Sequence, residues 1–170
     1  MGYLLTMTLK LSWRVMVGTL VLLVVGAAPA ADRPSPFYPD GYRQWTLTRF
    51  RLQGPESPNY EKQGGFRHYY ANQHALDSWG QFRDGAVIVD ERVHARLNAQ
   101  RNWEETGIAH VAVMLKDRKH HPDTGGWHFN IFFDGDTTTG LTADQAKARC
   151  FDACHATQEA RDFVFSDPRR

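Results

Sequence analysis

The sequence predicts an α+β domain, in which an antiparallel β-sheet of four to five strands packs with flanking helices. Two observations lead to this fold class. Segments rich in branched and aromatic residues recur along the chain, and such residues favour strands. Glycine, proline and aspartate separate these segments, and only a few stretches between or after them carry helix signals. Short turns between strands favour antiparallel pairing.

Five segments carry the strand signal. They are 45–52, 66–70, 86–89, 108–115 and 127–133. The first alternates apolar and polar residues with one slip in phase, as a half-buried strand does. The third is a continuous branched run, typical of a buried strand, and the last is the most aromatic segment in the chain. A polar stretch from Asn98 to Thr106 interrupts the pattern between the third and the fourth.

Two segments carry helix signals. Asn72 belongs to the residue types preferred at helix N-caps, so it predicts a short helix that ends before Gly80. Thr142 and Gln145 have the spacing of a capping box. Strong helix formers follow them, which predicts a helix that runs into Cys150.

The amino terminus has the form of a secretory signal peptide over residues 1–30. Lys10 and Arg14 precede the apolar run 15–27, and Ala28-Pro29-Ala30 supplies the small residues of a cleavage site. We expect cleavage after Ala30 and a periplasmic or secreted protein. The alternative is an uncleaved membrane anchor, because 15–31 reaches the lower edge of spanning length.

The mature chain is expected to form one domain. Residues 31–41 are rich in proline and turn formers and predict an irregular leader, and residues 42–170 then form the domain. Charge is nearly balanced, with 20 Lys and Arg against 19 Asp and Glu. This balance gives no electrostatic footprint for a nucleic-acid partner.

Three residues separate the only two cysteines, Cys150 and Cys154, and His155 directly follows the second. Two thiols and an adjacent imidazole suit a covalent haem, whose usual motif has two intervening residues. On a helix, the two cysteines would share one face about 6 Å apart along the axis, and His155 would need local unwinding to join them. A disulfide and a zinc site are the alternatives.

The order of landmarks along the chain resembles the cytochrome P460 family, which includes the cytochromes called c′-beta. The likeness covers nearly the whole mature chain. The matching segments are 42–46, 70–72, 84–89, 113–117, 126–127, the motif from Cys150 to His155, and 162–166.

The resemblance implies a sheet and helices around one covalent haem c, bound through Cys150 and Cys154, with His155 as the proximal iron ligand. Members of the P460 type bond a lysine to the porphyrin rim and oxidise hydroxylamine, whereas c′-beta members lack this crosslink and bind nitric oxide. The segment 87–91, where that lysine would be sought, contains none. Lys62, Lys116 and Lys119 remain as alternatives.

Other residues are candidates for the haem pocket. His68 and Tyr70 alternate along the aromatic segment and share a face, so together with Phe66 they are candidates for its distal side. Met114 or His110 could be a sixth ligand, as in an electron carrier. Ordinary core packing is the alternative for each of them. The adjacent His120 and His121 have the pattern of solvated surface residues.

The sequence therefore predicts a periplasmic monohaem c-type cytochrome of the P460 type, which transfers electrons or binds a small nitrogen oxide such as NO. One alternative is a hydroxylamine-oxidising enzyme with a lysine-crosslinked haem. Another is a secreted binding domain with a disulfide and no haem. Expected partners are small nitrogen oxides or a redox protein. No nucleic acid and no stable membrane anchor after cleavage are expected, and a homodimer is a further expectation.

Overall fold

The computed structural model describes residues 37–167. The predicted signal peptide and the first part of the leader, residues 31–36, lie outside the described residues. Residues 37–39 form neither helix nor strand, but Phe37 and Tyr38 pack against a buried cluster of the sheet. Among the described residues, none belongs to a helix long and apolar enough to cross a membrane.

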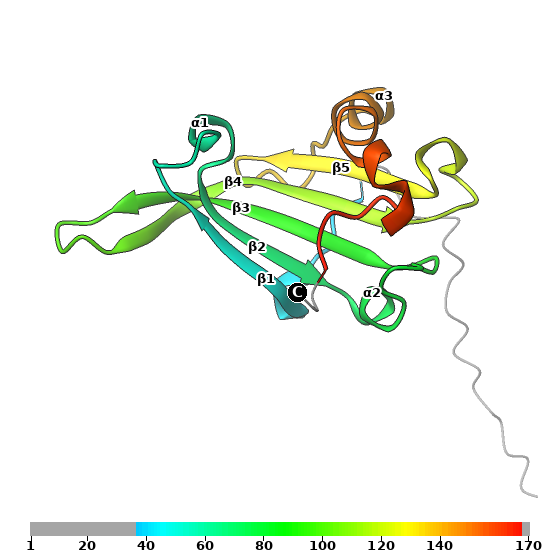
Figure 1. Cartoon of the computed structure of the whole chain (residues 1–170), viewed down its shortest axis with the longest axis horizontal. Helices are drawn as coiled ribbons and strands as arrows, with labels where there is room; N and C mark the ends of the chain where they lie inside the picture. Colours follow the sequence, from blue (N-terminus) through cyan, green and yellow to red (C-terminus); the bar gives the residue numbers. More distant parts are fainter. Residues whose placement is uncertain (1–36, 168–170) are drawn as a thin grey trace, which may run out of the picture.

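Five antiparallel strands form one sheet, in the order in which they occur in the chain (Figure 1). They are β1 (Thr46–Gln53), β2 (Gly65–Ala71), β3 (Val87–Leu97), β4 (Trp103–Lys116) and β5 (Trp127–Phe133). Each strand pairs with the next one along the chain, which is the topology expected when short connections join antiparallel strands. The predicted α+β class and its antiparallel sheet are confirmed.

Strands β3 and β4 are longer than the branched runs within them. Past the edge of the neighbouring strands they continue as a two-stranded hairpin, which projects from the sheet in Figure 1. The polar stretch from Asn98 to Thr106, expected to interrupt the pattern, holds the turn of this hairpin and the start of β4. Asn98 closes the turn, because its side chain accepts a hydrogen bond from the Asn102 N–H at 2.8 Å. Polar residues extend the pairing here because both faces of the hairpin are largely exposed.

Short helices complete the fold. They are η2 (Tyr42–Gln44), α1 (Tyr60–Gln63), α2 (Gln73–Asp77), η3 (Pro122–Thr124), α3 (Ala143–Ala146), η4 (Lys147–Asp152) and η5 (His155–Arg161). The predicted N-cap of α2 is confirmed, since the Asn72 side chain accepts from the Ala75 N–H at 2.9 Å. The same side chain donates to the Gly85 carbonyl at 2.9 Å and accepts from the Val87 N–H at 3.0 Å. Asn72 thus ties α2 to the start of β3.

The two faces of the sheet carry separate buried clusters. The N-terminal face is covered by residues 37–45 and packs Tyr42, Val87, Val89, Val111, Val113, Leu115 and Phe132. The cavity face packs Ala71, Ala75, Phe82, Ala86, Ile88, Met114, Trp127, Phe129, Ala146 and Val164. Alternation along each strand separates the two sets.

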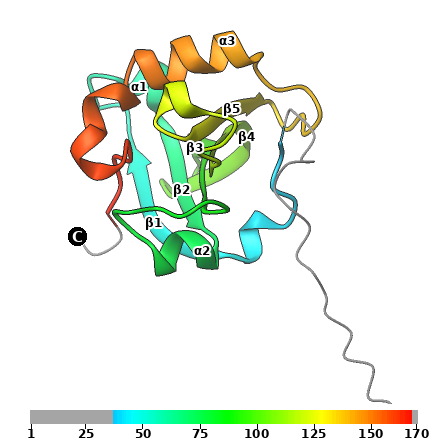
Figure 2. The ribbon, with the colours of Figure 1, turned by 90° about the vertical axis from the view of Figure 1, so that its right-hand side faces the viewer.

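A C-terminal arm, residues 143–166, lies against the cavity face. It consists of α3, η4, η5 and residues 162–166, which begin with a turn. Figures 1 and 2 both show α3 beside β5, and the red helical turns follow it on the same side of the molecule. The arm supplies Ala146 and Val164 to the cluster of the cavity face.

Candidate functional site

The arm begins as predicted and then departs from α-helical geometry. The capping box is present: Thr142 Oγ1 accepts from the Gln145 N–H at 3.3 Å, and Gln145 Oε1 accepts from the Thr142 N–H at 3.1 Å. After α3, however, the chain forms a π-helical turn, η4, which holds Cys150. The Ala153 N–H bonds the Ala148 carbonyl, five residues back, at 3.2 Å. The helix that runs into Cys150 is therefore confirmed, and the added residue widens its turn.

The helical run breaks at the second cysteine. Cys154 has φ −140° and ψ −59°, and a 3₁₀ helix, η5, starts at His155. The local unwinding expected for His155 is present at this residue. Both thiols are free, with Cys150 half-buried and Cys154 exposed. Burial raises the pKa of the Cys150 thiol to about 11, so this cysteine is held as the neutral thiol.

His155 is held in one tautomer by the arm itself. Its Nδ1 lies 2.6 Å from the Phe163 carbonyl oxygen, which can only accept a hydrogen bond. Nδ1 therefore carries the proton, and Nε2 keeps a free lone pair. The ring packs between Phe129 and Phe165, each with its centroid 4.9 Å away. Burial lowers the pKa of His155, which favours the neutral imidazole that a metal needs.

Cys150, Cys154 and His155 line one cavity of about 430 Å³ between the arm and the cavity face. This volume falls in the range of ordinary ligand pockets. Its apolar lining consists of Ile88, Ala112, Met114, Phe129, Val164 and Phe165, and Val113 borders it too although it packs in the cluster of the N-terminal face. Its polar lining consists of Arg49, Arg51, Gln63, Arg67, Tyr69, Asp90, Asn130 and Ser166.

The residues expected on the distal side do not line this cavity. Phe66, His68 and Tyr70 project from the other face of β2, where Tyr70 packs against the N-terminal cluster and His68 contacts Glu105 at 3.1 Å. The same strand sends Arg67 and Tyr69 into the cavity lining. The two sets of residues share one strand but lie on different faces, because side chains one residue apart point to opposite sides. On that other face, Phe66 and His68 both pack against Phe50, with ring centroids 5.6 and 5.2 Å away.

The sequence reasoning missed an ion pair within the cavity. Arg67 donates through Nε to Asp90 Oδ1 at 3.1 Å, and an Nη group of Arg67 bonds the other oxygen of the carboxylate. The pairing register places Tyr69 opposite Asp90, and the Arg67 guanidinium lies 5.7 Å from the centre of the Tyr69 ring. The available signal was Asp90 itself, a carboxylate directly after the branched run 86–89.

The other sequence candidates are spread around the site. Met114 lines the cavity. His110, which is four residues away on the same face of β4, does not. Burial lowers the pKa of His110 to about 4. His120 is exposed and pairs with Asp117 at 2.8 Å, and the His121 ring lies 4.9 Å from that of His128.

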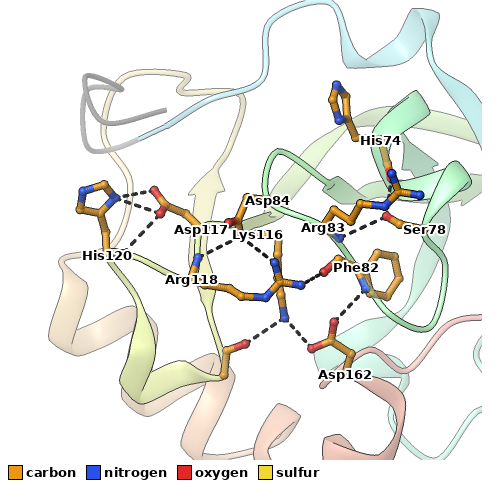
Figure 3. A network of polar contacts seen from close by, with 11 residues as sticks. His74, Ser78, Phe82, Arg83, Asp84, Lys116, Asp117, Arg118, His120 and Asp162 are labelled. Carbon is orange, nitrogen blue, oxygen red and sulfur yellow. Dashed lines mark hydrogen bonds and ion pairs between the residues drawn. The ribbon is translucent and has the colours of Figure 1, made fainter. Parts of the chain in front are cut away.

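No lysine of residues 37–167 belongs to the cavity lining. Lys62 and Lys119 are exposed, and Lys116 is buried in an ion pair with Asp162 (Figure 3). Within the same residues, no group of three or more His, Cys, Asp or Glu side chains could hold a metal ion. The site therefore offers two thiols and one imidazole around a cavity that is part apolar and part cationic.

Comparison with known proteins identifies a family. A family model described as cytochrome P460 matches residues 39–166, which is most of the chain and includes the sheet and the whole arm. No curated protein matches the chain. The family implies haem binding. The chain belongs to the cytochrome P460 family.

Proposed function

We propose that this protein is an exported monohaem c-type cytochrome that binds a small nitrogen oxide such as NO. The observation that carries the proposal is the shared cavity of Cys150, Cys154 and His155. Export is supported by the form of residues 1–30 and by the chemistry, because haem is attached covalently outside the cytoplasm.

The residues present fit a covalently attached haem. Two free thiols at one cavity can each form a thioether with a vinyl group, and His155 presents an unprotonated Nε2 as an axial ligand. The π-helical turn accommodates the third intervening residue, so the longer spacer does not force Cys150 and Cys154 to different cavities. A bound haem would supply an iron that coordinates a small diatomic ligand.

The polar side of the cavity favours ligand binding. Arg67 uses Nε and one Nη group on Asp90, which leaves further N–H donors on the guanidinium. Tyr69 adds a phenol beside them, and burial raises its pKa, so it stays protonated as a donor. Donors at a ligand pocket can stabilise a polar diatomic molecule. This polar lining supports the binding of a nitrogen oxide.

Electron transfer is the second candidate, and one observation favours it. Met114 lines the cavity, and a thioether as sixth ligand would fill the coordination site and raise the reduction potential. Met114 also packs in the cluster of the cavity face with Ile88 and Phe129. Its contacts with that cluster support a packing role, so we rank ligand binding first.

Hydroxylamine oxidation on a crosslinked haem finds less support. The cavity lining of the described residues includes no lysine, and Lys116 is engaged by Asp162 and the Gly125 carbonyl. Arginines occupy the cationic side of the cavity instead. We therefore propose a haem without the lysine crosslink.

The test is a visible spectrum of the protein expressed with a haem-maturation system, oxidised and then reduced, with a haemochrome assay and the mass of the intact chain. We expect one covalent haem, a five-coordinate reduced iron, and a spectral change when NO is added. A six-coordinate iron whose spectrum does not change when NO is added supports electron transfer. A red-shifted band near 460 nm, which the family name implies for the crosslinked form, supports hydroxylamine oxidation. Absence of haem refutes the proposal.

A further inference from the structure

The carbonyl that holds His155 belongs to a strained turn. Asp162 has φ 50° and Phe163 has φ 63°, so two consecutive residues other than glycine lie in the left-handed region. Aspartate tolerates this conformation, but for a bulky aromatic residue it is uncommon. Such a backbone persists only where the surrounding contacts fix it. The contacts around residues 162 and 163 therefore set where the Phe163 carbonyl points.

Lys116, at the end of β4, provides the central contact. Its side chain is 2% exposed, and Nζ donates to Asp162 Oδ1 at 2.5 Å and to the Gly125 carbonyl at 2.9 Å (Figure 3). The second carboxylate oxygen of Asp162 accepts from the Phe82 N–H at 3.0 Å. The Asp162 backbone carbonyl accepts from Trp127 Nε1 at 2.9 Å. Strands β4 and β5 and the loop that contains Phe82 thus all bind one residue of the arm.

The next residue is fixed by packing. The Phe163 ring lies against Gly125 so closely that a Cβ on Gly125 would overlap it. Gly125 also has φ 64°, which favours glycine for a second reason. On its other side the Phe163 ring packs against Phe151 with centroids 5.3 Å apart. The carbonyl that accepts from His155 belongs to Phe163 itself and follows its Cα, so the anchored Asp162 before it and the packed ring together fix the residue that carries this carbonyl.

We propose that Lys116 and Asp162 form a positioning pair that acts on the proximal histidine through the Phe163 carbonyl. The pair keeps this carbonyl 2.6 Å from His155 Nδ1, which orients the imidazole and increases the basicity of Nε2. This inference rests on the proposed haem. A more basic imidazole donates more strongly to iron, strengthens the iron–histidine bond and lowers the reduction potential.

The test compares haem-loaded variants by the iron–histidine stretching band of the reduced protein and by the midpoint potential. Asp162→Asn is the main variant, since asparagine tolerates positive φ and can still accept from the Phe82 N–H. It removes the charge that Lys116 pairs with. Lys116→Met removes the other partner, and Lys116→Arg is the conservative variant that should restore part of the effect.

We expect both disruptive variants to move the band to lower frequency and the potential upward. Partners of this kind commonly change metal affinity or activity at least about tenfold. A tenfold change in the ratio of oxidised to reduced protein corresponds to about 59 mV. The matched control is Glu91→Gln. It breaks the ion pair between Arg43 and the buried Glu91, which lies on the opposite face of the sheet.

The positioning role is overturned if Asp162→Asn shifts neither readout more than Glu91→Gln does in haem-loaded protein. It is also overturned if Lys116→Met moves the readouts and Lys116→Arg moves them equally, because the charge would then be irrelevant. If Lys116→Met fails to fold, Asp162→Asn with its control still decides. A wild-type chain without haem refutes the proposed function itself, whereas loaded wild type with unresponsive variants refutes only the positioning.

Discussion

The two faces of the sheet use the same strands for different purposes. On the N-terminal face, aromatic and branched side chains close over one another, as where Tyr38 packs edge-on against Phe132 at 5.0 Å. On the cavity face, the same strands carry an ion pair and leave a space of about 430 Å³ beneath the arm. One face is a packed core, and the other is a site.

Adjacent residues on β3 show the difference most directly. Glu91 is 3% exposed and pairs with Arg43 on the N-terminal face, whereas Asp90 pairs with Arg67 in the cavity. Both are carboxylates with an arginine partner, yet only Asp90 can touch a ligand in the cavity. The comparison teaches that the face to which a residue points, more than its type, decides whether it belongs to the site.

The largest effect is expected from His155→Ala. Loss of the imidazole should abolish normal proximal ligation, and added imidazole should restore part of the native spectrum, because the cavity remains. The control is His68→Ala, since His68 lies on the other face. Visible spectra of both variants provide the measurement. A native spectrum in His155→Ala, or an equal loss in His68→Ala, would contradict the division between the faces.

On the N-terminal face, Phe132→Ala tests packing. Phe132 is 1% exposed, and truncation of a buried phenylalanine typically costs about 3–5 kcal/mol of unfolding free energy. We expect that loss in urea unfolding, with an unchanged haem spectrum in the folded protein. An altered spectrum at low denaturant would show that the two faces are coupled.

The buried His128 should make the stability of the protein depend on pH. Burial, with the nearby His121, lowers the pKa of His128 to about 4, against an opposing effect of Asp117. Between pH 6.5 and 4 the unfolded chain binds a proton at His128 that the folded chain does not, so stability falls as the pH falls. The loss from pH 7 to pH 5 is about 2 kcal/mol for this residue.

The contribution of His128 is measured by urea unfolding of the wild type and of His128→Asn, each at pH 7 and pH 5. His110, on the cavity face, also has a pKa of about 4 and remains in both proteins as an internal reference. The variant should lose less stability than the wild type on going to pH 5. Equal losses in the two proteins would mean that His128 does not titrate in this range.

The smallest effect is expected from Asp90→Asn compared with Glu91→Gln. Asp90→Asn frees Arg67 in the cavity, so we expect the affinity for NO to change by about tenfold, which is about 1.4 kcal/mol. Glu91→Gln should leave the affinity unchanged, because its partner Arg43 lies on the other face. Titration of the reduced protein with NO decides. Equal effects of the two variants would argue against a role of the Arg67–Asp90 pair.

The sequence predicted the sheet well because strand signals are local. Branched and aromatic runs identify all five strands, and Asn72 and Thr142 are caps whose partners lie three residues away. The motif of Cys150, Cys154 and His155 was also a local signal, and the structure gathers its members at one cavity.

The features that the sequence did not predict depend on contacts between residues far apart in the chain. Arg67 meets Asp90 only through the register of β2 and β3, and Lys116 meets Asp162 across 46 positions of the chain. The aromatic content of β2 indicated a strand but not which face would border the cavity. The π-helical turn was also not predicted, because local propensity favoured an ordinary α-helix.

The chain-order arrangement of the strands has a consequence for the order of folding. Every strand pairs with its neighbour in sequence, so the sheet can form from local contacts, which generally form fast. The arm follows all five strands in the chain, and side-chain packing, hydrogen bonds and the Lys116–Asp162 ion pair, with no strand pairing, hold it to the sheet. It can therefore open without unpairing a strand, which would leave both cysteines accessible for the haem attachment proposed above while the sheet stays folded. Hydrogen exchange faster in residues 147–161 than in β3 and β4 would be the signature of that late docking.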